Sequence, residues 1–479
     1  MGNKNNQDNR IKPQTLKGFR DILPEEMNAR DRIIKVIREV FEFYGFSPMA
    51  SPALEYKEVL CGYGDEASKQ IYTFTDPDGK KVGLRFDLTV PLSRIVSQYR
   101  DLPRPFKRYQ IQPVWRYDKP DPGRFREFLQ FDIDTIGTKS LVADSEILAA
   151  MNDSLTKLGV KFRIRFSSRK ILSSMIKFAG IDEKLTKDVL RVIDKLDKQG
   201  IANVKLELAD GRIDSSGDKI PGIGLNQGQI EKIEQYLKLP NTERKETLQA
   251  LRALLSAVEG AKENIDELEQ IDCFLGAMNV PDENIVIDPS IARGLDYYTG
   301  PIYEAIMLDA PRFGSVMGGG RYDNLIEIFT GQPTPAVGAS IGVDRILSAM
   351  QSLGKVKSRA AVADVLVTVM DKERMPEYLK IAGELRDAGI KTEVFLGKAG
   401  SIGKQLKYAD RQGHPFALIL GQDEFDAGTV SLKDLRKIED MEEEIADRDA
   451  WLKARIGQQT LKREELIPIL KSMLNQLKS

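Results

Sequence analysis

Apolar side chains recur every three or four residues between positions 24 and 44, which is the spacing of one face of a helix. Pro24 suits the first turn of this helix. A strand is predicted over residues 81–86, and Thr89 is placed to cap a second helix that runs to Tyr99. The start of the chain is therefore predicted to mix helices with strands.

Residues 106–118 and 126–137 have strand patterns on either side of the polar loop 119–124, which predicts an antiparallel hairpin. Along the second strand the side chains alternate, so that one face is apolar and the other polar. The apolar face carries Leu129, Phe131 and Ile133, and the polar face carries Gln130, Asp132 and Asp134. An ordinary amphipathic strand with one wet face would have the same pattern.

The rest of the pattern divides the chain into three regions. Residues 168–280 are highly charged and mostly helical, and they separate a helix and strand before position 167 from further strands at 285–350. A break near 355–362 precedes alternating strands and helices, typical of a small α/β domain with a partly parallel sheet. Strands are predicted there at 364–370, 391–395 and 415–420, helices at 375–387 and 402–412, and a helical tail at 437–479.

Composition narrows the classes of protein. The 479 residues carry a net charge of −1, so there is no global basic field, and any nucleic acid must be bound by local patches. One histidine and two cysteines argue against a His/Cys zinc site and against a disulfide framework. No apolar run reaches the ~18 residues that span a bilayer, and the N-terminus has no signal-peptide pattern. We therefore expect a cytoplasmic protein that does not bind membranes.

Residues 293–300 read Arg-Gly-Leu-Asp-Tyr-Tyr-Thr-Gly and follow an apolar strand-like stretch. So many polar groups near a core are costly unless they meet a polar ligand. Arg293 can hold an anion, and Tyr297 and Tyr298 can hydrogen-bond a small polar group. The alternative is a strand end with packed tyrosines and a solvated Arg–Asp pair.

Arginines gather on the predicted hairpin, where Arg108, Arg116, Arg124 and Arg126 favour a site for a polyanion. A planar guanidinium suits two-point contact with phosphate. Arg345, in the stretch from Gly338 to Arg345, would be a further anion clamp at the start of a helix.

Asp87 and Thr89 lie on one face at the end of a predicted strand, where a carboxylate and a hydroxyl can hold an ammonium group. Helix capping by Thr89 is the simpler explanation. The glycines at 318–320 and 338–342 let a ligand approach the backbone, although a pair of tight turns would use them too.

A serine hydrolase is a formal rival, because residues 338–342 match the pattern G-x-S-x-G and His414 follows in the right order. The triad would need this sole histidine, which precedes an apolar strand of the separate C-terminal region. The hydrolase is therefore the weaker interpretation.

Together these motifs resemble class II aminoacyl-tRNA synthetases, and specifically the histidyl-tRNA synthetase family. The resemblance extends from Lys17 to about Leu435. The family's opening and its first class motif are similar to residues 17–24 and the helix that follows them. Its second class motif is similar to 116–128 and its third to 338–345. Its specific histidine-binding loop is similar to 293–300. The stretch 421–433 resembles the closing hairpin of its last domain.

The resemblance implies an α+β catalytic domain, built on an antiparallel sheet with flanking helices, a helical insertion and a C-terminal α/β anticodon-binding domain. The implied limits are a polar tail at 1–15, the catalytic domain at 16–167 and 281–355, the insertion at 168–280, the anticodon-binding domain at 362–457 and a helical tail at 458–479. It also implies a homodimer that activates L-histidine with ATP and Mg²⁺ and transfers it to the 3′ end of tRNA(His).

Carried over residue by residue, the resemblance implies roles for the residues above. Arg116 and Arg293 would be catalytic. Histidine would be bound by Asp87, Thr89, Arg116, Gln130, Asp134, Arg293, Tyr297 and Tyr298. ATP would be bound by Arg116, Asp118, Arg124, Phe128 and Arg345, and no side chain is assigned to a metal.

The chain departs from the pattern at Asp87 and Asp134, which stand where many bacterial members carry the longer Glu. Two alternatives within the resemblance remain. A non-catalytic regulatory subunit of this fold would lack the anticodon-binding domain and usually the histidine-loop residues, and a tRNA-sensing protein would carry a further fused domain.

Overall fold

The computed structural model describes residues 11–60, 69–121, 123–214, 217–292, 297–356, 358–398, 401–436 and 457–476. The chain forms two compact units. The first comprises Met1–Asp21 and Arg32–Val356, and the second comprises Ile22–Asp31 and Lys357–Ser479. No helix among the described residues is both long and apolar enough to cross a bilayer.

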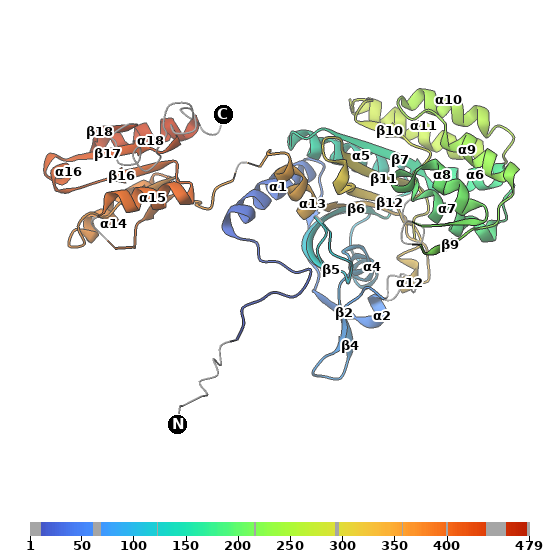
Figure 1. Cartoon of the computed structure of the whole chain (residues 1–479), viewed down its shortest axis with the longest axis horizontal. Coiled ribbons are helices and arrows are strands. Elements are labelled where there is room, and N and C mark those ends of the chain that lie inside the picture. The colour runs from blue at the N-terminus through green and yellow to red at the C-terminus, as the bar shows by residue number, and fades with distance from the viewer. Residues whose placement is uncertain are drawn as a thin grey trace. The chain divides into compact units, whose positions relative to one another are not determined.

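An eight-stranded sheet organises the first unit, in the order β1-β5-β6-β13-β12-β11-β7-β10 (Figure 1). Neighbouring strands are antiparallel through the centre and parallel at both edges, where β1 pairs with β5 and β7 with β10. The strands are β1 (Ser47–Pro48), β5 (Phe106–Trp115), β6 (Glu127–Ile136), β7 (Phe162–Ser168), β10 (Ile285–Ile287), β11 (Pro301–Met307), β12 (Ser315–Arg321) and β13 (Ala336–Gly342). The predicted class II sheet is thus present, with mixed edges.

The β5–β6 hairpin is the predicted one, and its register places Gln112 opposite Gln130. On one face of β6, Phe131 packs edge-on against Phe41 of helix α1 (Pro24–Phe43), with ring centroids 4.9 Å apart. Since side chains alternate along a strand, the polar residues of β6 point to the opposite face. That face is the floor of the site described below.

The other helices of the first unit flank this sheet, and α5 packs across its central strands. Asp87 caps α4, because its Oδ1 accepts hydrogen bonds from the backbone N–H groups of Thr89 and Val90, both at 3.1 Å. The prediction that Thr89 caps this helix is therefore wrong, and Thr89 is its first residue. The helices are α2 (Lys57–Leu60), α4 (Thr89–Gln98), α5 (Leu141–Lys157), α12 (Glu327–Thr330) and α13 (Val343–Ser352), with a short 3₁₀ helix at Pro311–Phe313.

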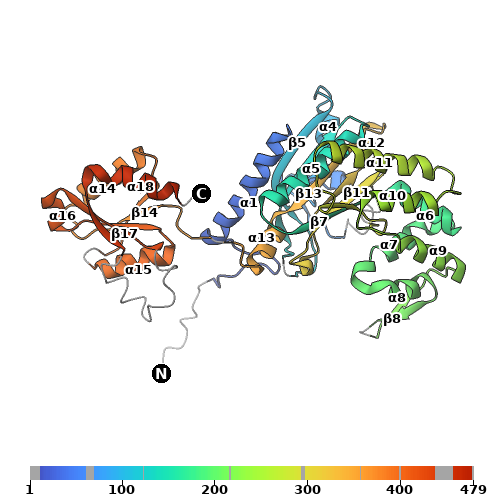
Figure 2. The same cartoon turned by 90° about the horizontal axis from the view of Figure 1, so that it is seen from above.

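Two smaller parts complete the first unit. A three-stranded sheet, in the order β2-β4-β3, contains β2 (Leu54–Tyr56), β3 (Thr73–Thr75) and β4 (Lys81–Leu84). The segment predicted as a helical insertion gathers beside the β7–β10 edge of the large sheet (Figures 1 and 2). It contains α6 (Arg169–Ala179), a 3₁₀ turn (Glu183–Leu185), α7 (Thr186–Ile193), α8 (Leu196–Leu208), β8 (Gly211–Ile213), β9 (Lys219–Pro221), α9 (Gln227–Leu237), α10 (Arg244–Leu254) and α11 (Ala261–Ala277).

The second unit is an α/β domain with a five-stranded sheet in the order β15-β14-β16-β17-β18. Val365 and Val367 of β14 point into a core with α14 and α18, while Leu366 between them packs against α15 on the other face. Both faces are therefore covered. The elements are β14 (Val365–Val367), α14 (Met375–Asp387), β15 (Thr392–Val394), α15 (Ile402–Gln412), β16 (Phe416–Ile419), α16 (Gln422–Ala427), β17 (Thr429–Asp434), β18 (Gln458–Lys462), a 3₁₀ helix (Arg463–Glu465) and α18 (Leu466–Asn475).

Two predictions for this unit need correction. The stretch 421–433 is not a hairpin by itself, since α16 precedes the single strand β17. The tail is not wholly helical either, because β18 pairs antiparallel with β17 and so makes the hairpin with it. Residues 437–456 lie outside the described residues. The long sequence separation hides this pairing, because nothing local in 458–462 identifies its partner strand.

Candidate active site

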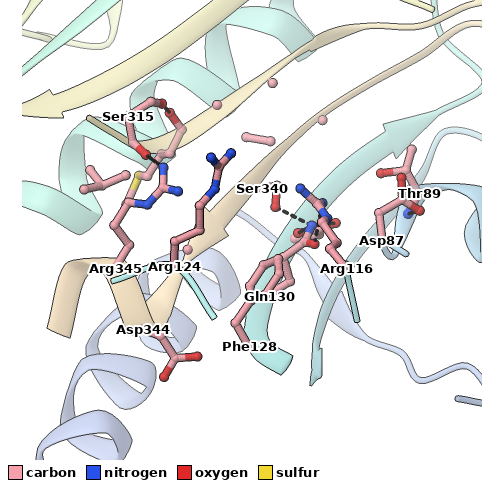
Figure 3. A pocket seen from close by; sticks show the side chains of 18 of the residues that line it. Asp87, Thr89, Arg116, Arg124, Phe128, Gln130, Ser315, Ser340, Asp344 and Arg345 are labelled. Carbon is pink, nitrogen blue, oxygen red and sulfur yellow. Dashed lines mark hydrogen bonds between the residues drawn. The ribbon is translucent and has the colours of Figure 1, made fainter. Parts of the chain in front are cut away.

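A cavity of ≈ 280 Å³ opens on the polar face of the large sheet. Its lining contains every described residue to which the family resemblance assigns a role, and Figure 3 labels part of this lining. These are Asp87, Thr89, Arg116, Asp118, Arg124, Phe128, Gln130, Asp134, Tyr297, Tyr298 and Arg345. Arg293 lies outside the described residues. Residues more than 250 positions apart in the chain are thus brought to one place by the pairing of β6 with β13 and of β12 with β13.

Arg116 occupies the middle of the cavity. In Figure 3 it lies between Arg124 and Arg345 on one side and Asp87 and Thr89 on the other. Its Nε donates to the carbonyl oxygen of Phe86 at 3.0 Å, and its Nη2 donates to Oε1 of Gln130 at 3.2 Å. The guanidinium also lies over the rings of Phe86 and Phe128. Burial lowers the pKa of Arg116 from its ordinary value, which Asp87 and other anionic groups oppose. This cation is therefore desolvated and fixed, as an electrostatic catalyst requires.

Two further arginines form one end of the cavity, where Arg124 and Arg345 extend side by side in Figure 3. Arg345 Nη1 donates to the carbonyl oxygen of Ser315 at 2.5 Å. The Arg124 side chain is half-exposed and lies 3.6 Å from a carboxylate oxygen of Asp118. This end is cationic and open to solvent, which suits the phosphates of a nucleotide.

Asp87 and Thr89 lie at the opposite end of the cavity, and Gln130 lies beside Arg116 between the two ends (Figure 3). Gln130 Nε2 donates to Oγ of Ser340 at 2.6 Å and to Oδ1 of Asp132 at 3.1 Å. Burial raises the pKa of Asp132 to about 6, which neighbouring Arg108 and hydrogen bonds oppose. Carboxylates, a hydroxyl and an amide oxygen in one corner can hold an ammonium group.

Asp134 marks the deepest polar corner and is buried. One carboxylate oxygen accepts a hydrogen bond from the hydroxyl of Tyr322, and the other lies 2.7 Å from Nη2 of Arg108. Burial raises the pKa of Asp134 to about 7, against the opposing effect of Arg108. The hydroxyl of Tyr297 donates to that of Tyr298 at 3.1 Å, and burial raises the pKa of Tyr297 well above its usual range. This corner offers a carboxylate and neutral phenols to a small polar ring.

Comparison with known proteins now identifies the family. The sequence model of the histidyl-tRNA synthetase family matches residues 18–346, which is more than half of the chain. The chain belongs to the histidyl-tRNA synthetase family. An anticodon-binding domain model matches residues 364–473.

Similar proteins cover nearly the whole length. A histidine–tRNA ligase of Ruegeria sp. (strain TM1040) is 42% identical, with 97% of each chain covered. The crystal structure of a histidyl-tRNA synthetase from Nostoc sp. PCC 7120 superposes with a TM-score of 0.81 at 33% identity, over 97% of this chain and 100% of that one. A Bacillus halodurans structure, titled as an ATP phosphoribosyltransferase regulatory subunit/histidyl-tRNA synthetase, has a TM-score of 0.68 at 21% identity, over 83% of this chain and 97% of that one. That last likeness shows the fold alone.

The four arginines predicted to form one polyanion site are divided by the structure. Arg116 and Arg124 line the cavity of this family member, whereas Arg108 and Arg126 do not. Arg126 lies over the ring of Tyr117, and its Nε donates to the carbonyl oxygen of Asp118 at 3.1 Å. Arg108 is fully buried beside Asp134. The prediction of four converging arginines is wrong, because Arg108 is held in the core beside Asp134, and Arg126 is held by the ring of Tyr117 and the carbonyl oxygen of Asp118.

Sequence reasoning missed the roles of several lining residues. Tyr322 was visible in the motif Gly318–Asp323, but only the pairing of β12 with β13 brings its hydroxyl to Asp134. Asp344 accepts hydrogen bonds from the backbone N–H of Leu129 at 2.7 Å and from Arg20 at 3.1 Å. No local signal in the sequence joins these three positions.

The hydrolase reading fails on geometry. Ser340 lies within the regular strand β13 and accepts a hydrogen bond from Gln130, instead of occupying a sharp strand-to-helix turn. His414 is buried in the second unit, where its Nε2 lies 2.8 Å from a carboxylate oxygen of Glu393. The presence of glycine at position 338 is explained by the lack of space there, because a Cβ would lie 1.9 Å from Oδ1 of Asp134.

Metal ligands are sparse in this family member. Within the described residues, no group of three or more His, Cys, Asp or Glu side chains is placed to hold a metal ion. In ATP-using sites Mg²⁺ is usually held by one or two carboxylates together with phosphate oxygens and water.

Proposed function

We propose that this chain activates L-histidine with ATP to histidyl-adenylate and then transfers histidine to the 3′ end of tRNA(His). Membership of the histidyl-tRNA synthetase family supports the reaction. The observation that carries the proposal is the convergence of Arg116 and Arg345 with Asp87 and Asp134 in one cavity. Such a site offers cations for two anionic reactants and hydrogen-bonding groups for one amino acid.

The first step joins two groups that repel each other. An oxygen of the histidine carboxylate attacks the α-phosphorus of ATP, and the bond from that phosphorus to pyrophosphate breaks. Arg116 would contact both the carboxylate and the α-phosphate, since it lies between the two ends of the cavity. We assign Arg293 to the charge that grows at the phosphorus, on the family resemblance alone. A fixed donor of this kind typically contributes ~10²–10³ in rate.

Histidine would be oriented by the groups at the opposite end from Arg124 and Arg345. Asp87, Thr89 and Gln130 would hold its ammonium group. Asp134 would accept one imidazole N–H, while Tyr298, with Tyr297 beside it, would donate to the other ring nitrogen. A site that satisfies both ring nitrogens can reject amino acids without them by up to ~10⁴–10⁵.

ATP would occupy the cationic end. Arg124 and Arg345 would contact its distal phosphates and adenine region, and Phe128 would stack beside the nucleotide, with Asp118 nearby. Magnesium would enter with ATP and be held mainly by phosphate oxygens and water.

Transfer needs a tRNA partner and, as we propose, a second copy of the chain. The anticodon-binding domain at 364–473 supports tRNA binding by the second unit. Half-exposed Leu54, Tyr56 and Phe74 on the three-stranded sheet are candidates for the homodimer interface. Sedimentation of the full chain tests this, and a monomer at micromolar concentration would contradict it. The cytoplasmic location stays a prediction from the cysteine count.

Histidine-dependent exchange between pyrophosphate and ATP tests the reaction. We expect exchange with wild-type protein and a loss of ~10²–10³ in rate for Arg116→Met, which removes the charge at similar length. Charging of tRNA(His) measures the second step, which is the transfer of histidine to the tRNA. A folded wild-type protein without exchange would leave a non-catalytic relative as the answer.

A further inference from the structure

Arg108 is a buried arginine that lies behind the cavity and does not line it. It stands on β5 directly opposite Asp134 on β6, so the two side chains share a face of the hairpin. Its Nη2 lies 2.7 Å from Oδ2 of Asp134. Neither residue is more than 2% exposed, so each is the main compensation for burying the other.

Arg108 also reaches the ammonium corner of the cavity. Its Nη2 donates to the carbonyl oxygen of Leu88 at 3.3 Å, and Leu88 joins Asp87 to Thr89. Its Nη1 donates to Oε1 of Gln110 at 3.1 Å, which fixes the guanidinium from the other side. One side chain thus forms an ion pair with Asp134 and donates a hydrogen bond to the backbone between Asp87 and Thr89.

We propose that Arg108 is a positioning residue for amino-acid selection, which holds Asp134 ionised and in place and couples it to the Asp87–Thr89 segment. This inference rests on the proposed function, because it assigns Asp134 to the imidazole. It also accounts for the shorter carboxylate at this position. Aspartate reaches less far into a pocket than glutamate, and a guanidinium behind it restricts where its oxygens can lie.

The charges around Asp134 explain why the cation is needed. Asp132 on the same strand and Asp87 ahead of α4 both raise the pKa of Asp134, in addition to burial. Arg108 from β5 and the Tyr322 hydroxyl after β12 lower it. β13 brings only the backbone of Gly338 against this carboxylate. Removing Arg108 leaves one hydroxyl against burial and two carboxylates, so Asp134 would be protonated at neutral pH.

The experiment compares histidine-dependent pyrophosphate exchange in wild type and Arg108→Met across pH. We expect KM for histidine to rise about threefold at pH 7.5, because a pKa one unit above about 7 lowers the ionised fraction of Asp134 from about three quarters to about one quarter. KM for ATP should be unchanged, and the acid limb of kcat/KM for histidine should move to higher pH. The ionisation of free histidine affects kcat/KM of both proteins equally, so it cancels when their pH profiles are compared.

Arg244→Met is the matched control, since Arg244 is a buried arginine in the helical segment that pairs with Asp272 and Asp282. It should lower the unfolding temperature without changing KM for histidine or the pH limb. Arg108→Lys keeps the positive charge, so the acid limb of its kcat/KM profile for histidine should lie closer to that of wild type.

If Arg108→Met does not fold, Arg108→Gln decides, because it removes the charge but keeps groups that can hydrogen-bond. A raised KM for histidine with an unchanged KM for ATP supports the inference, and equal constants overturn it. An Arg108→Met protein that folds and keeps the wild-type KM and pH limb also overturns it, while the proposed function stands. Absence of exchange in wild type would instead refute the proposed function.

Discussion

Nη2 of Arg20 lies 3.1 Å from Oδ1 of Asp344, the residue immediately before Arg345. The Arg20 guanidinium also lies 4.0 Å from the ring centre of Phe125, the neighbour of Arg124. A single side chain from the start of the chain therefore contacts both segments that carry the cationic end of the cavity. Asp344 is held on its other side by the backbone of Leu129.

Arg20→Ala should weaken ATP binding and leave histidine binding unchanged. The substitution removes a charge-assisted hydrogen bond, commonly worth about 1.5–3 kcal/mol, so Arg345 and Arg124 lose part of their support. We expect KM for ATP to rise about tenfold in pyrophosphate exchange. Arg100→Ala, at an exposed position of the same unit, is the control. An equal rise of both Michaelis constants would point instead to a general loss of folding.

Gly338→Ala should abolish most activity, although it adds only a methyl group. The new Cβ would lie 1.9 Å from Oδ1 of Asp134 and 2.6 Å from the carbonyl oxygen of Ile133, and a backbone atom cannot easily give way. Asp134 must then move, and a displacement near 1 Å in a site can cost ~10²-fold in rate. Histidine-dependent exchange measures the loss.

Gly276→Ala is a suitable control for that change, because a Cβ at Gly276 in helix α11 meets no atom within 4 Å. It should leave histidine-dependent exchange unaltered, and the unfolding temperature should stay the same or rise. Wild-type exchange by Gly338→Ala would contradict the packing of β13 on β6.

Activity on histidine should fall steeply below neutral pH. Asp134 accepts an imidazole N–H only when ionised, and burial raises its pKa to about 7. A group with a raised pKa is protonated below that value, so kcat/KM for histidine falls as pH drops through about 7. Free histidine itself gains a proton near ~6.5. With two groups that must both be unprotonated, the logarithmic plot should approach a slope of two below pH ~6.

The pH profile of kcat/KM for ATP at saturating histidine is the internal control, since bound histidine keeps Asp134 ionised. A slope of one that follows the titration of free histidine alone would show that Asp134 does not titrate in this range.

Local pattern predicted the elements well where one face of an element is buried. The helix at 24–44, the 106–137 hairpin and the helices at 375–387 and 402–412 all have apolar stripes at the period of their own structure. Patterns of this kind arise from burial itself, so they can be read without knowing what does the covering. Strand β18 has no such stripe: its residues 458–462 are polar apart from Leu461, and its pairing was missed.

The residue types indicated which chemical groups the site can bind, but they did not indicate which residue contacts which group. Arginines, carboxylates and tyrosines at 87–89, 116–134, 297–298 and 345 predicted sites for a polyanion, an ammonium group and a small polar group, and the family resemblance joined them into one site for ATP and histidine. Which arginine faces the ligand depends on strand register and burial. Arg108 lies within β5 and Arg116 directly follows its last residue, yet Arg108 lies behind the cavity and Arg116 lines it.

The sequence by itself determined the apolar periodicities, the family motifs and the inventory of charged groups, all of which are local in the chain. Only the tertiary structure decided that Arg108 lies against Asp134 and that Arg20 contacts Asp344. Those contacts join residues through space, and their electrostatic effect depends on distance and on loss of water, neither of which is written along the chain.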